Sequence, residues 1–393
     1  MKQIYFSENS GIAFDKENVY ANSTKVSTEE IGETPIEEYA YKIMRESYGK
    51  ILSKQYENIV VLSGAGTSVG IGEGTQKGKT MLQLWKVIVQ EIGIPTLLSF
   101  AEKIKFNGIA ESNTDLEALL SRAILSESYI SQKDVKKAID DIETIIRREC
   151  SLILPDNAPH DIFLRKIIAR KLKYPRIKIF TLNYDLLFEQ AATRGGYVVI
   201  DGFSFTTPRK FSGTNFDYDI VIRNNNRALS EENFAPKVFQ LYKPHGSLDW
   251  DRVITKGGED FIKSSSPKSP VMIYPSSSKF ELSYEQPYFE MISRFQQEMR
   301  TKNTLLLVIG FSFSDKHIKA MIMEALNINP SITLVIISPD VYKDNQFSEL
   351  KDKSVTMKNV ILINETFENF AKYYPYSEVY DYSSGVVLSN ESI

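Results

Sequence analysis

The stretch ENIVVLSGAGTS at residues 57–68 decides the fold expected for this chain. Residues 59–62 form a continuous apolar run, and Gly64 and Gly66 follow almost directly. An uninterrupted apolar run is typical of a strand covered on both faces, as in a parallel sheet. Glycines after such a strand let the backbone turn tightly and approach a ligand closely. We therefore predict a buried strand that enters a tight, glycine-lined turn.

Similar apolar runs recur along the chain and alternate with segments of helical spacing. Helical spacing is found at 36–54, before the first strand, and at 184–193 and 316–325, each after a later strand. This alternation predicts an α/β fold, a Rossmann-like doubly wound parallel sheet. The further strands are expected at residues 177–182, 198–200, 238–246, 304–310 and 333–338.

A helical block is expected to interrupt this sheet at about residues 79–172, between two strands. The block is clearest where apolar residues recur at three- and four-residue spacing, at Val135, Ala138, Ile139, Ile142 and Ile146. The expected domain covers residues 36–375, with this helical subdomain inserted. Residues 1–35 are interpreted as an N-terminal arm or small strand pair, residues 376–393 as a C-terminal tail, and residues 264–278 as a Ser/Pro-rich loop.

The composition is that of an ordinary globular protein, with 42% hydrophobic and 25% charged residues among 393. A net charge of -3 gives no general attraction to nucleic acid or an anionic membrane, although it leaves room for a local basic groove. The start, MKQIYFSENSG, lacks the basic-then-apolar layout of a secretory signal. No stretch approaches the roughly 18 apolar residues of a membrane span. We expect a cytoplasmic protein.

Cys150 is the only cysteine, so neither an intrachain disulfide nor a four-cysteine zinc site can form. The three histidines, His160, His245 and His317, are far apart in the sequence, and no structural metal is expected. Cys150 is interpreted as a buried, inert thiol beside a helix. His160 and His317 stand at apparent helix starts and are interpreted as structural.

Polar residues follow several predicted strands, at the edge where open α/β sheets bind ligands. Asn183 and Asp185 follow one strand in TLNYD. They either face one cleft together, or Asp185 simply caps the next helix. His245, in KPHGS, follows another strand. It is either a general base that titrates near neutral pH or a structural histidine whose hydrogen bonds are satisfied.

Two later predicted strands are also followed by glycine or polar residues. Gly310 and Ser312, in GFSFSD, precede a helix whose N-terminus could receive phosphate, with Asp315 as its cap. Ser338 and Asp340, in IISPD, stand where an adenosine ribose is often held in such folds. One glycine-rich turn alone is weak evidence, since it also serves as a plain connection. Several such strand ends on one edge predict a nucleotide site.

GAGTS, TLNYD, KPHGS and GFSFSD resemble, in order and approximate spacing, the motifs of sirtuins. The resemblance covers roughly residues 55–370. It is strongest to the divergent bacterial sirtuin-like proteins of anti-phage defence systems, which are mostly NAD hydrolases. It implies an NAD glycohydrolase, with NAD as substrate, that gives nicotinamide and ADP-ribose. Such an enzyme would deplete cellular NAD, as in abortive infection, when a partner or an infection signal activates it.

The resemblance also implies roles for individual residues. Asn183 would contact the nicotinamide ribose and orient water, and His245 would be the general base. Asp185 would support the carboxamide region of the site. The other cofactor-binding residues would lie along the pyrophosphate and the riboses: Gly64, Ala65, Gly66, Thr67, Ser68, Gly310, Ser312 and Ser338.

The chain departs from sirtuin deacylases in two respects. It lacks their four zinc-binding cysteines, so no zinc is expected. VGIGEGTQKGK at 69–79 stands in place of their Gly-Ile-Pro segment. Both departures make transfer of an acyl group from lysine less expected than hydrolysis. The helical insertion resembles those of defence proteins, where it would occlude a peptide channel or mediate assembly.

Two other functions stay open. One is an NAD-dependent protein deacylase or ADP-ribosyltransferase, and the other is a sensor or assembly subunit that binds NAD or ADP-ribose without turnover. The resemblance implies a homo-oligomer and, as neighbours, a ring-forming DNA-translocase ATPase or an Argonaute-type protein. Contact with nucleic acid would then be indirect, and no membrane is involved.

Overall fold

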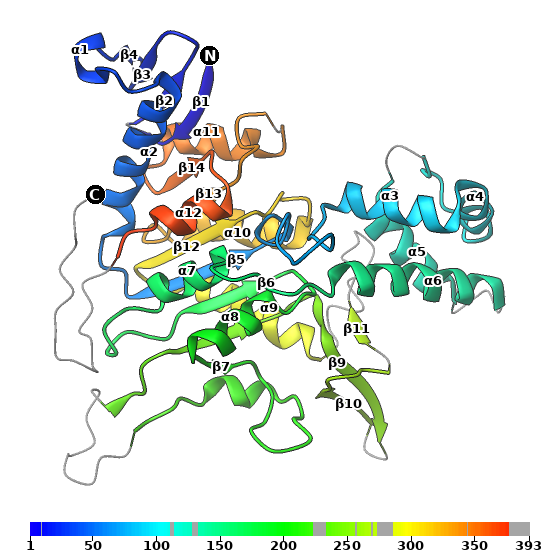
Figure 1. Cartoon of the computed structure of the whole chain (residues 1–393). Helices are drawn as coiled ribbons and strands as arrows, with labels where there is room; N and C mark the ends of the chain where they lie inside the picture. The colour runs from blue at the N-terminus through cyan, green and yellow to red at the C-terminus, as the bar shows by residue number, and fades with distance from the viewer. Residues whose placement is uncertain are drawn as a thin grey trace.

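The centre of the fold is a set of parallel strands (Figure 1). We analysed a computed structural model, which describes residues 1–8, 10–110, 114–127, 133–222, 233–255, 258–268, 270–272, 286–343 and 345–376. The parallel strands are β5 (Asn58–Ser63), β6 (Lys178–Thr181), β7 (Val198–Ile200), β8 (Val238–Tyr242), β12 (Thr304–Ile309), β13 (Thr333–Ile337) and β14 (Val360–Ile363). Their order across the sheet is β7-β8-β6-β5-β12-β13-β14.

The strand order reverses beside β5. From β5 the chain forms β6 and the edge strand β7 on one side and then inserts β8 between them. It next returns to place β12 on the other side of β5 and continues through β13 and β14. This reversal is the topological switch of a doubly wound sheet, where ligands bind at the carboxyl ends of the strands. The predicted Rossmann-like fold is confirmed. Gly64 follows β5 and Gly310 follows β12, the two strands that flank the switch.

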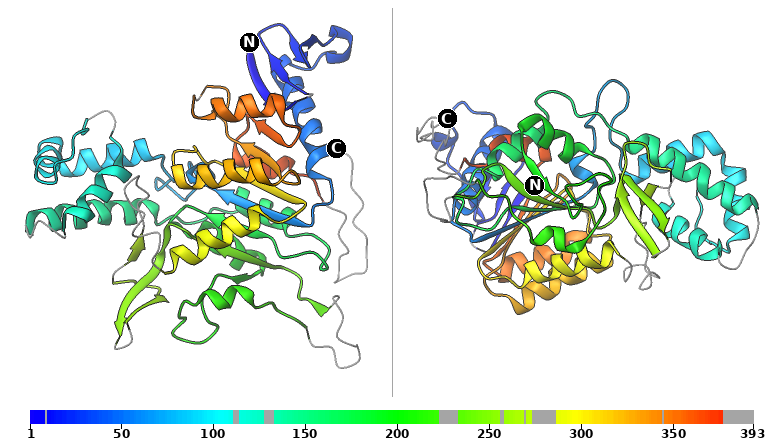
Figure 2. Two further views of the ribbon diagram at one scale, coloured as in Figure 1. Left: turned by 180° about the vertical axis from the view of Figure 1, so that it is seen from behind. Right: turned by 90° about the horizontal axis from the view of Figure 1, so that it is seen from below.

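Helices cover both faces of the sheet, which is why its strands are continuously apolar. Val61 faces one core and Val60 and Leu62 face the other. The first face is covered by α2 (Ile36–Leu52), α7 (Pro159–Ile167), α8 (Leu187–Gly195) and α12 (Phe367–Tyr373). The second is covered by α9 (Tyr288–Met299), α10 (Lys316–Ile328) and α11 (Ser348–Thr356), drawn yellow to orange in Figure 2.

A helical lobe is inserted between β5 and β6 and stands out beside the sheet (Figures 1 and 2). It consists of α3 (Met81–Ile92), α4 (Ile94–Lys103), α5 (Leu116–Glu127) and α6 (Lys133–Cys150). The lobe has its own core, which includes Trp85 and Ile142. Within the expected insertion at 79–172, α7 instead packs on the main sheet through Phe163 and Leu164.

Among the described residues, no single helix is both long enough and apolar enough to cross a membrane. The pair α3 and α4 passes that test only when taken together, and the two helices are bent by 101°.

The N-terminal residues extend the main sheet instead of forming a separate arm. β1 (Lys2–Phe6) pairs antiparallel with β14, which would otherwise be an exposed edge. Three short strands continue outward from it: β2 (Ile12–Phe14), β3 (Val19–Ala21) and β4 (Thr24–Lys25). They are followed by the short helix α1 (Thr28–Ile31).

A second, antiparallel sheet corrects two sequence predictions. It contains β9 (Gly246–Thr255), β10 (Gly258–Lys263) and β11 (Pro270–Met272). The strand expected at 238–246 is therefore divided, because β8 ends at Tyr242 and β9 begins at Gly246. The loop expected at 264–278 contains β11, and its remainder from 273 onward lies outside the described residues, as do residues 377–393 of the expected tail.

Candidate functional site

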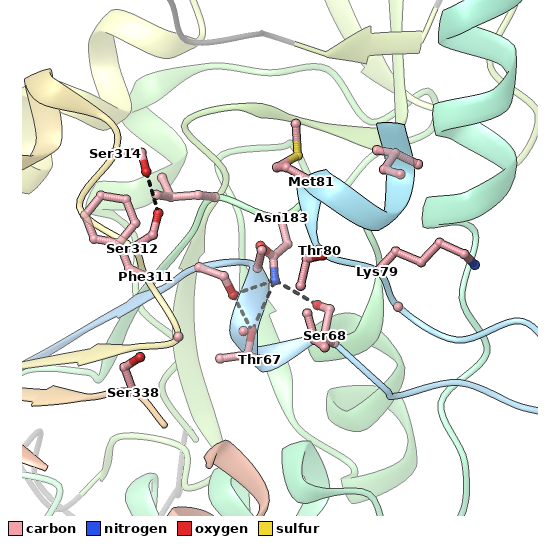
Figure 3. Close-up of a pocket in the computed structure, with 18 of the residues that line it drawn as sticks. Thr67, Ser68, Lys79, Thr80, Met81, Asn183, Phe311, Ser312, Ser314 and Ser338 are labelled. Carbon is pink, nitrogen blue, oxygen red and sulfur yellow. Dashed lines mark hydrogen bonds between the residues drawn. The ribbon is translucent and has the colours of Figure 1, made fainter. Parts of the chain in front are cut away.

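A cavity of about 870 Å³ opens at the topological switch (Figure 3). Its volume falls within the range of ligand pockets, roughly 300–1,000 Å³. The carboxyl ends of β5, β6, β12 and β13 line it, together with residues of the helical lobe. The structure brings all of the site residues predicted from sequence to this one cavity: Gly64, Ala65, Gly66, Thr67, Ser68, Asn183, Asp185, His245, Gly310, Ser312 and Ser338.

The floor of the cavity is made where the loops after β5 and β12 touch. The Gly66 amide donates to the Gly310 carbonyl at 2.8 Å. A Cβ on Gly66 would lie 2.6 Å from Gly310 Cα, and a Cβ on Gly64 would lie 2.7 Å from the Gly310 oxygen. Gly310 also has a φ of +62°. These glycines therefore permit a close backbone contact that no other residue allows, and we call this the glycine seat (Gly64, Gly66, Gly310).

Alanine at Gly310 should lower the free energy of unfolding by about 2–4 kcal/mol, because it adds a backbone collision to backbone strain. Gly196 is a matched control, since its φ is +65° but a Cβ there would meet nothing within 4 Å. Gly196→Ala should cost only the strain, about 1–2 kcal/mol. Urea denaturation of both variants measures the difference, and equal losses would contradict the close contact.

Asn183 ties the loop after β6 to the glycine seat. Its Nδ2 donates to the Gly64 carbonyl at 3.0 Å, to Thr67 Oγ1 at 3.1 Å and to Ser68 Oγ at 2.8 Å (Figure 3). A carbonyl can only accept, so the contact with Gly64 sets which way round the amide stands. Within the described part of the chain, the Asn183 oxygen has no hydrogen-bond partner of its own. It is the atom that can accept a hydrogen bond from a bound molecule.

Asp185 is buried beside this loop, at 7% exposure. Its Oδ2 accepts from Ser68 Oγ at 2.6 Å, and its Oδ1 accepts from the Leu187 amide at 3.1 Å. Burial raises the pKa of the Asp185 carboxyl, while Lys243, Ser68 and the Leu187 amide oppose that rise. The residue therefore caps α8 and also lines the cavity, so both of its expected roles are compatible with the structure.

His245 is 8% exposed, and its Nε2 lies 3.2 Å from Asp315 Oδ2. Burial alone would raise the pKa of the Asp315 carboxyl, but the hydrogen bond and charge of His245 and the amides of Ile318 and His317 hold it below its ordinary value. An ionised carboxylate only accepts, so Nε2 carries the hydrogen. Nδ1 is then the ring nitrogen able to take up a proton.

Asp315 has a second role that the sequence does not reveal. Its Oδ1 accepts from the amides of His317 and Ile318, which confirms the expected cap of α10. The pairing of its other oxygen with His245 spans 70 residues of sequence, so no local spacing could indicate it. The sequence also gives no sign that Lys243 is buried beside the site, because a lysine is most often on the surface.

The serines expected on the adenosine side gather around the loops after β12 and β13 (Figure 3). Ser312 Oγ lies 2.8 Å from Ser314 Oγ, which donates to Gln346 at 3.2 Å. Ser338 is nearly buried, and its Oγ accepts from the Asp340 amide at 3.4 Å. All of these groups offer hydroxyls rather than charges to the cavity.

The helical lobe supplies a wall that the sequence did not predict, with Thr80, Met81, Leu116, Ile146 and Cys150 among its lining residues. Cys150 is the last residue of α6 and is only partly buried, so the expectation of a buried thiol beside a helix is wrong in that respect. Desolvation raises the pKa of its thiol to about 12, which favours an inert thiol. In the described ranges, no three His, Cys, Asp or Glu side chains are placed to hold a metal ion.

The other two histidines differ from each other. His160 is fully buried against Phe188 and Phe367, and burial lowers its pKa to about 3, which confirms a structural role. His317 is exposed and lines the cavity at the start of α10, and its structural role stays a prediction.

A glycine seat and polar strand ends at a topological switch define an α/β protein of the nucleotide-binding class. Residues 177–358 match the SIR2-like domain family. The match spans somewhat less than half of the chain, and it contains Asn183, His245 and Gly310 but not the turn at Gly64. It supports a sirtuin-like family and an NAD-related activity in general. No curated protein matches the chain.

Proposed function

We propose that this protein hydrolyses NAD at the bond between nicotinamide and ribose, releasing nicotinamide and ADP-ribose. The observation that carries the proposal is one shared cavity, lined by the glycine seat, by Asn183 and by the paired His245. The small residues of the glycine seat let a pyrophosphate approach the backbone closely, and the similarity to the SIR2-like domain favours NAD as the dinucleotide.

The bond to be broken determines what the residues must do. The nicotinamide of NAD is cationic, so it leaves as a neutral molecule with the electron pair of the broken C–N bond and needs no proton. The ribose is left with oxocarbenium character, and water forms the new C–O bond, as in glycoside hydrolysis. The Asn183 oxygen would orient that water. His245 Nδ1 would accept its proton directly or through a ribose hydroxyl, and later release it to solvent.

Incubation of the whole purified chain with NAD, followed by chromatographic separation, tests the proposal. We expect nicotinamide and ADP-ribose in equal amounts without any added acceptor. Product formed only with an acylated or acceptor protein would indicate a deacylase or transferase instead. Tight binding of NAD without product, even with enzyme in excess over hours, would indicate a sensor or assembly subunit and would overturn hydrolysis.

We further propose a role in anti-phage defence through NAD depletion, on the resemblance of the motifs alone. The expected homo-oligomer, and a partner of the DNA-translocase ATPase or Argonaute type, belong to the same proposal. The helical lobe is the element that most distinguishes this chain from a bare α/β domain, and it is the segment we would examine first for contacts with partners.

A further inference from the structure

We propose that Lys243 is a positioning residue that acts through Asp185 and Ser68 to hold the Asn183 carboxamide, whose orientation the Gly64 carbonyl sets, in a fixed position at the cavity. This role depends on the proposed NAD cleavage, in which the Asn183 carboxamide oxygen orients water. Lys243 does not itself touch the substrate in this scheme. It follows β8 directly and stands two residues before His245.

Lys243 is buried, at 2% exposure, where an ammonium group is costly unless it is paired. Its Nζ donates to the carbonyls of Tyr184, at 3.4 Å, and Asp185, and it forms an ion pair with Glu189 at 3.1 Å. Each of the three N–H donors therefore has an acceptor. These contacts join the strand end that carries His245 to the turn that carries Asn183.

Asn183 donates a hydrogen bond to Ser68, and Ser68 donates one to Asp185. An ionised Asp185 can only accept, so it takes the single hydroxyl hydrogen of Ser68 at 2.6 Å. The Ser68 oxygen is then free to accept from Asn183 Nδ2 at 2.8 Å. If Asp185 were protonated and donated to Ser68, the hydroxyl hydrogen would no longer be held by the carboxylate. The Ser68 hydroxyl would then lose its fixed orientation, and the contact that it accepts from Asn183 would be held less firmly.

The charge of Lys243 opposes protonation of Asp185. Burial raises the pKa of Asp185, and Lys243 is the strongest influence in the opposite direction. The other titratable groups around Lys243 are Glu189 on α8, which is its ion-pair partner, Asp249 and Lys263 on the small sheet, and the Cys150 thiol at the end of α6. Removal of the lysine charge should therefore let Asp185 take up its proton at a higher pH.

Lys243→Met provides the test, with the pH profile of nicotinamide release as readout. We expect kcat to fall by about tenfold or more, with KM for NAD little changed because the glycine seat is intact. The acid limb of the kcat profile should move to higher pH, and Lys243→Arg should restore it in part. A purely structural lysine would not move that limb.

Lys263→Met is the control, because Lys263 is a half-buried lysine between two carboxylates. It pairs with Asp201 at 2.8 Å and with Asp249 of the small sheet at 3.2 Å, and its charge acts on Glu189. Among the described residues it does not contact Asp185 or Asn183. This variant should lose stability but keep the acid limb of the wild type. A wild-type acid limb in Lys243→Met would overturn the inference.

Lys243→Met in an Asp185→Asn background completes a double-mutant cycle. It also keeps the inference testable if Lys243→Met alone folds poorly. Without a titrating Asp185, the loss of Lys243 should no longer move the acid limb. Urea unfolding gives a readout without substrate. The penalty of Lys243→Met should shrink as pH falls, and shrink less in Asp185→Asn. Equal pH dependence in both backgrounds would overturn the inference, whereas an inactive wild type would overturn only the proposed hydrolysis.

Discussion

His245→Ala should lower kcat for nicotinamide release by about 10²- to 10⁴-fold, the usual contribution of a well-placed general base. KM for NAD should change little, because the glycine seat is untouched. The structure supports this expectation through the Asp315 contact at 3.2 Å, which holds the imidazole with hydrogen on Nε2 and leaves Nδ1 as the base. Single-turnover assays of the purified variant measure the loss.

Asp315→Asn tests the pair of His245 and Asp315 by changing the carboxylate instead of the imidazole. The asparagine oxygen can still cap α10 through the His317 and Ile318 amides, so its NH₂ would face His245. Nε2 would then have to accept, and the hydrogen would move to Nδ1, which could no longer act as the base. We expect a large loss of kcat in this variant as well. His160→Leu, at a buried residue that does not itself line the cavity, should leave kcat unchanged, and a wild-type kcat in His245→Ala would reject the base role.

Asn183→Ala should lower kcat/KM by about 10²-fold or more, since displaced reacting groups are costly even at the scale of 1 Å. The substitution removes the oxygen that faces the cavity and also the three contacts that tie Gly64, Thr67 and Ser68 to the loop after β6. Both kcat and KM should therefore worsen, unlike in His245→Ala. Initial rates over a range of NAD concentrations separate the two constants.

Asn359→Ala is a suitable control for this experiment. Asn359 Nδ2 also donates to a backbone carbonyl, that of Ile332 at 2.7 Å, but it lies just before β14 and does not line the cavity. Asn359→Ala removes this donor from the Ile332 carbonyl, which costs about 1–3 kcal/mol of stability, whereas in Asn183→Ala the Gly64 carbonyl keeps the Thr67 amide at 3.0 Å and the Thr67 hydroxyl at 2.9 Å. A kinetic defect in Asn183→Ala alone, with no greater loss of stability than in Asn359→Ala, would support its role. Equal kinetics in the two variants would reject that role.

Much of the ligand edge was predictable because it depends on local constraints. An apolar run such as 59–62 specifies a strand buried on both faces, and Gly64 and Gly66 next to it specify close backbone approach. The cap by Asp315 is also local, since the acceptor lies within three residues of its donors. Because these local signals mark the ends of neighbouring parallel strands, the predicted site residues line one cavity.

Elements whose partners lie far away in sequence were predicted less well. The small sheet alternates weakly, and its strand β10 also pairs at Ile262 with the distant Lys210. β1 pairs with β14 across nearly the whole chain, and β2 to β4 extend the sheet from it. β14 itself was missed although its four residues are all apolar, because so short a run resembles part of a buried helix. The lobe was recognised as helical, but its role as a cavity wall was not.

By itself the sequence determined the parallel strands, the glycine turn and the set of polar strand ends, since strand burial and backbone freedom act over a few neighbouring residues. Only the tertiary structure decided which groups pair across the cavity, such as His245 with Asp315 and Lys243 with the Asp185 turn. Those pairings are chosen by where strands from distant parts of the chain end, and by the high cost of leaving a buried charge without a partner.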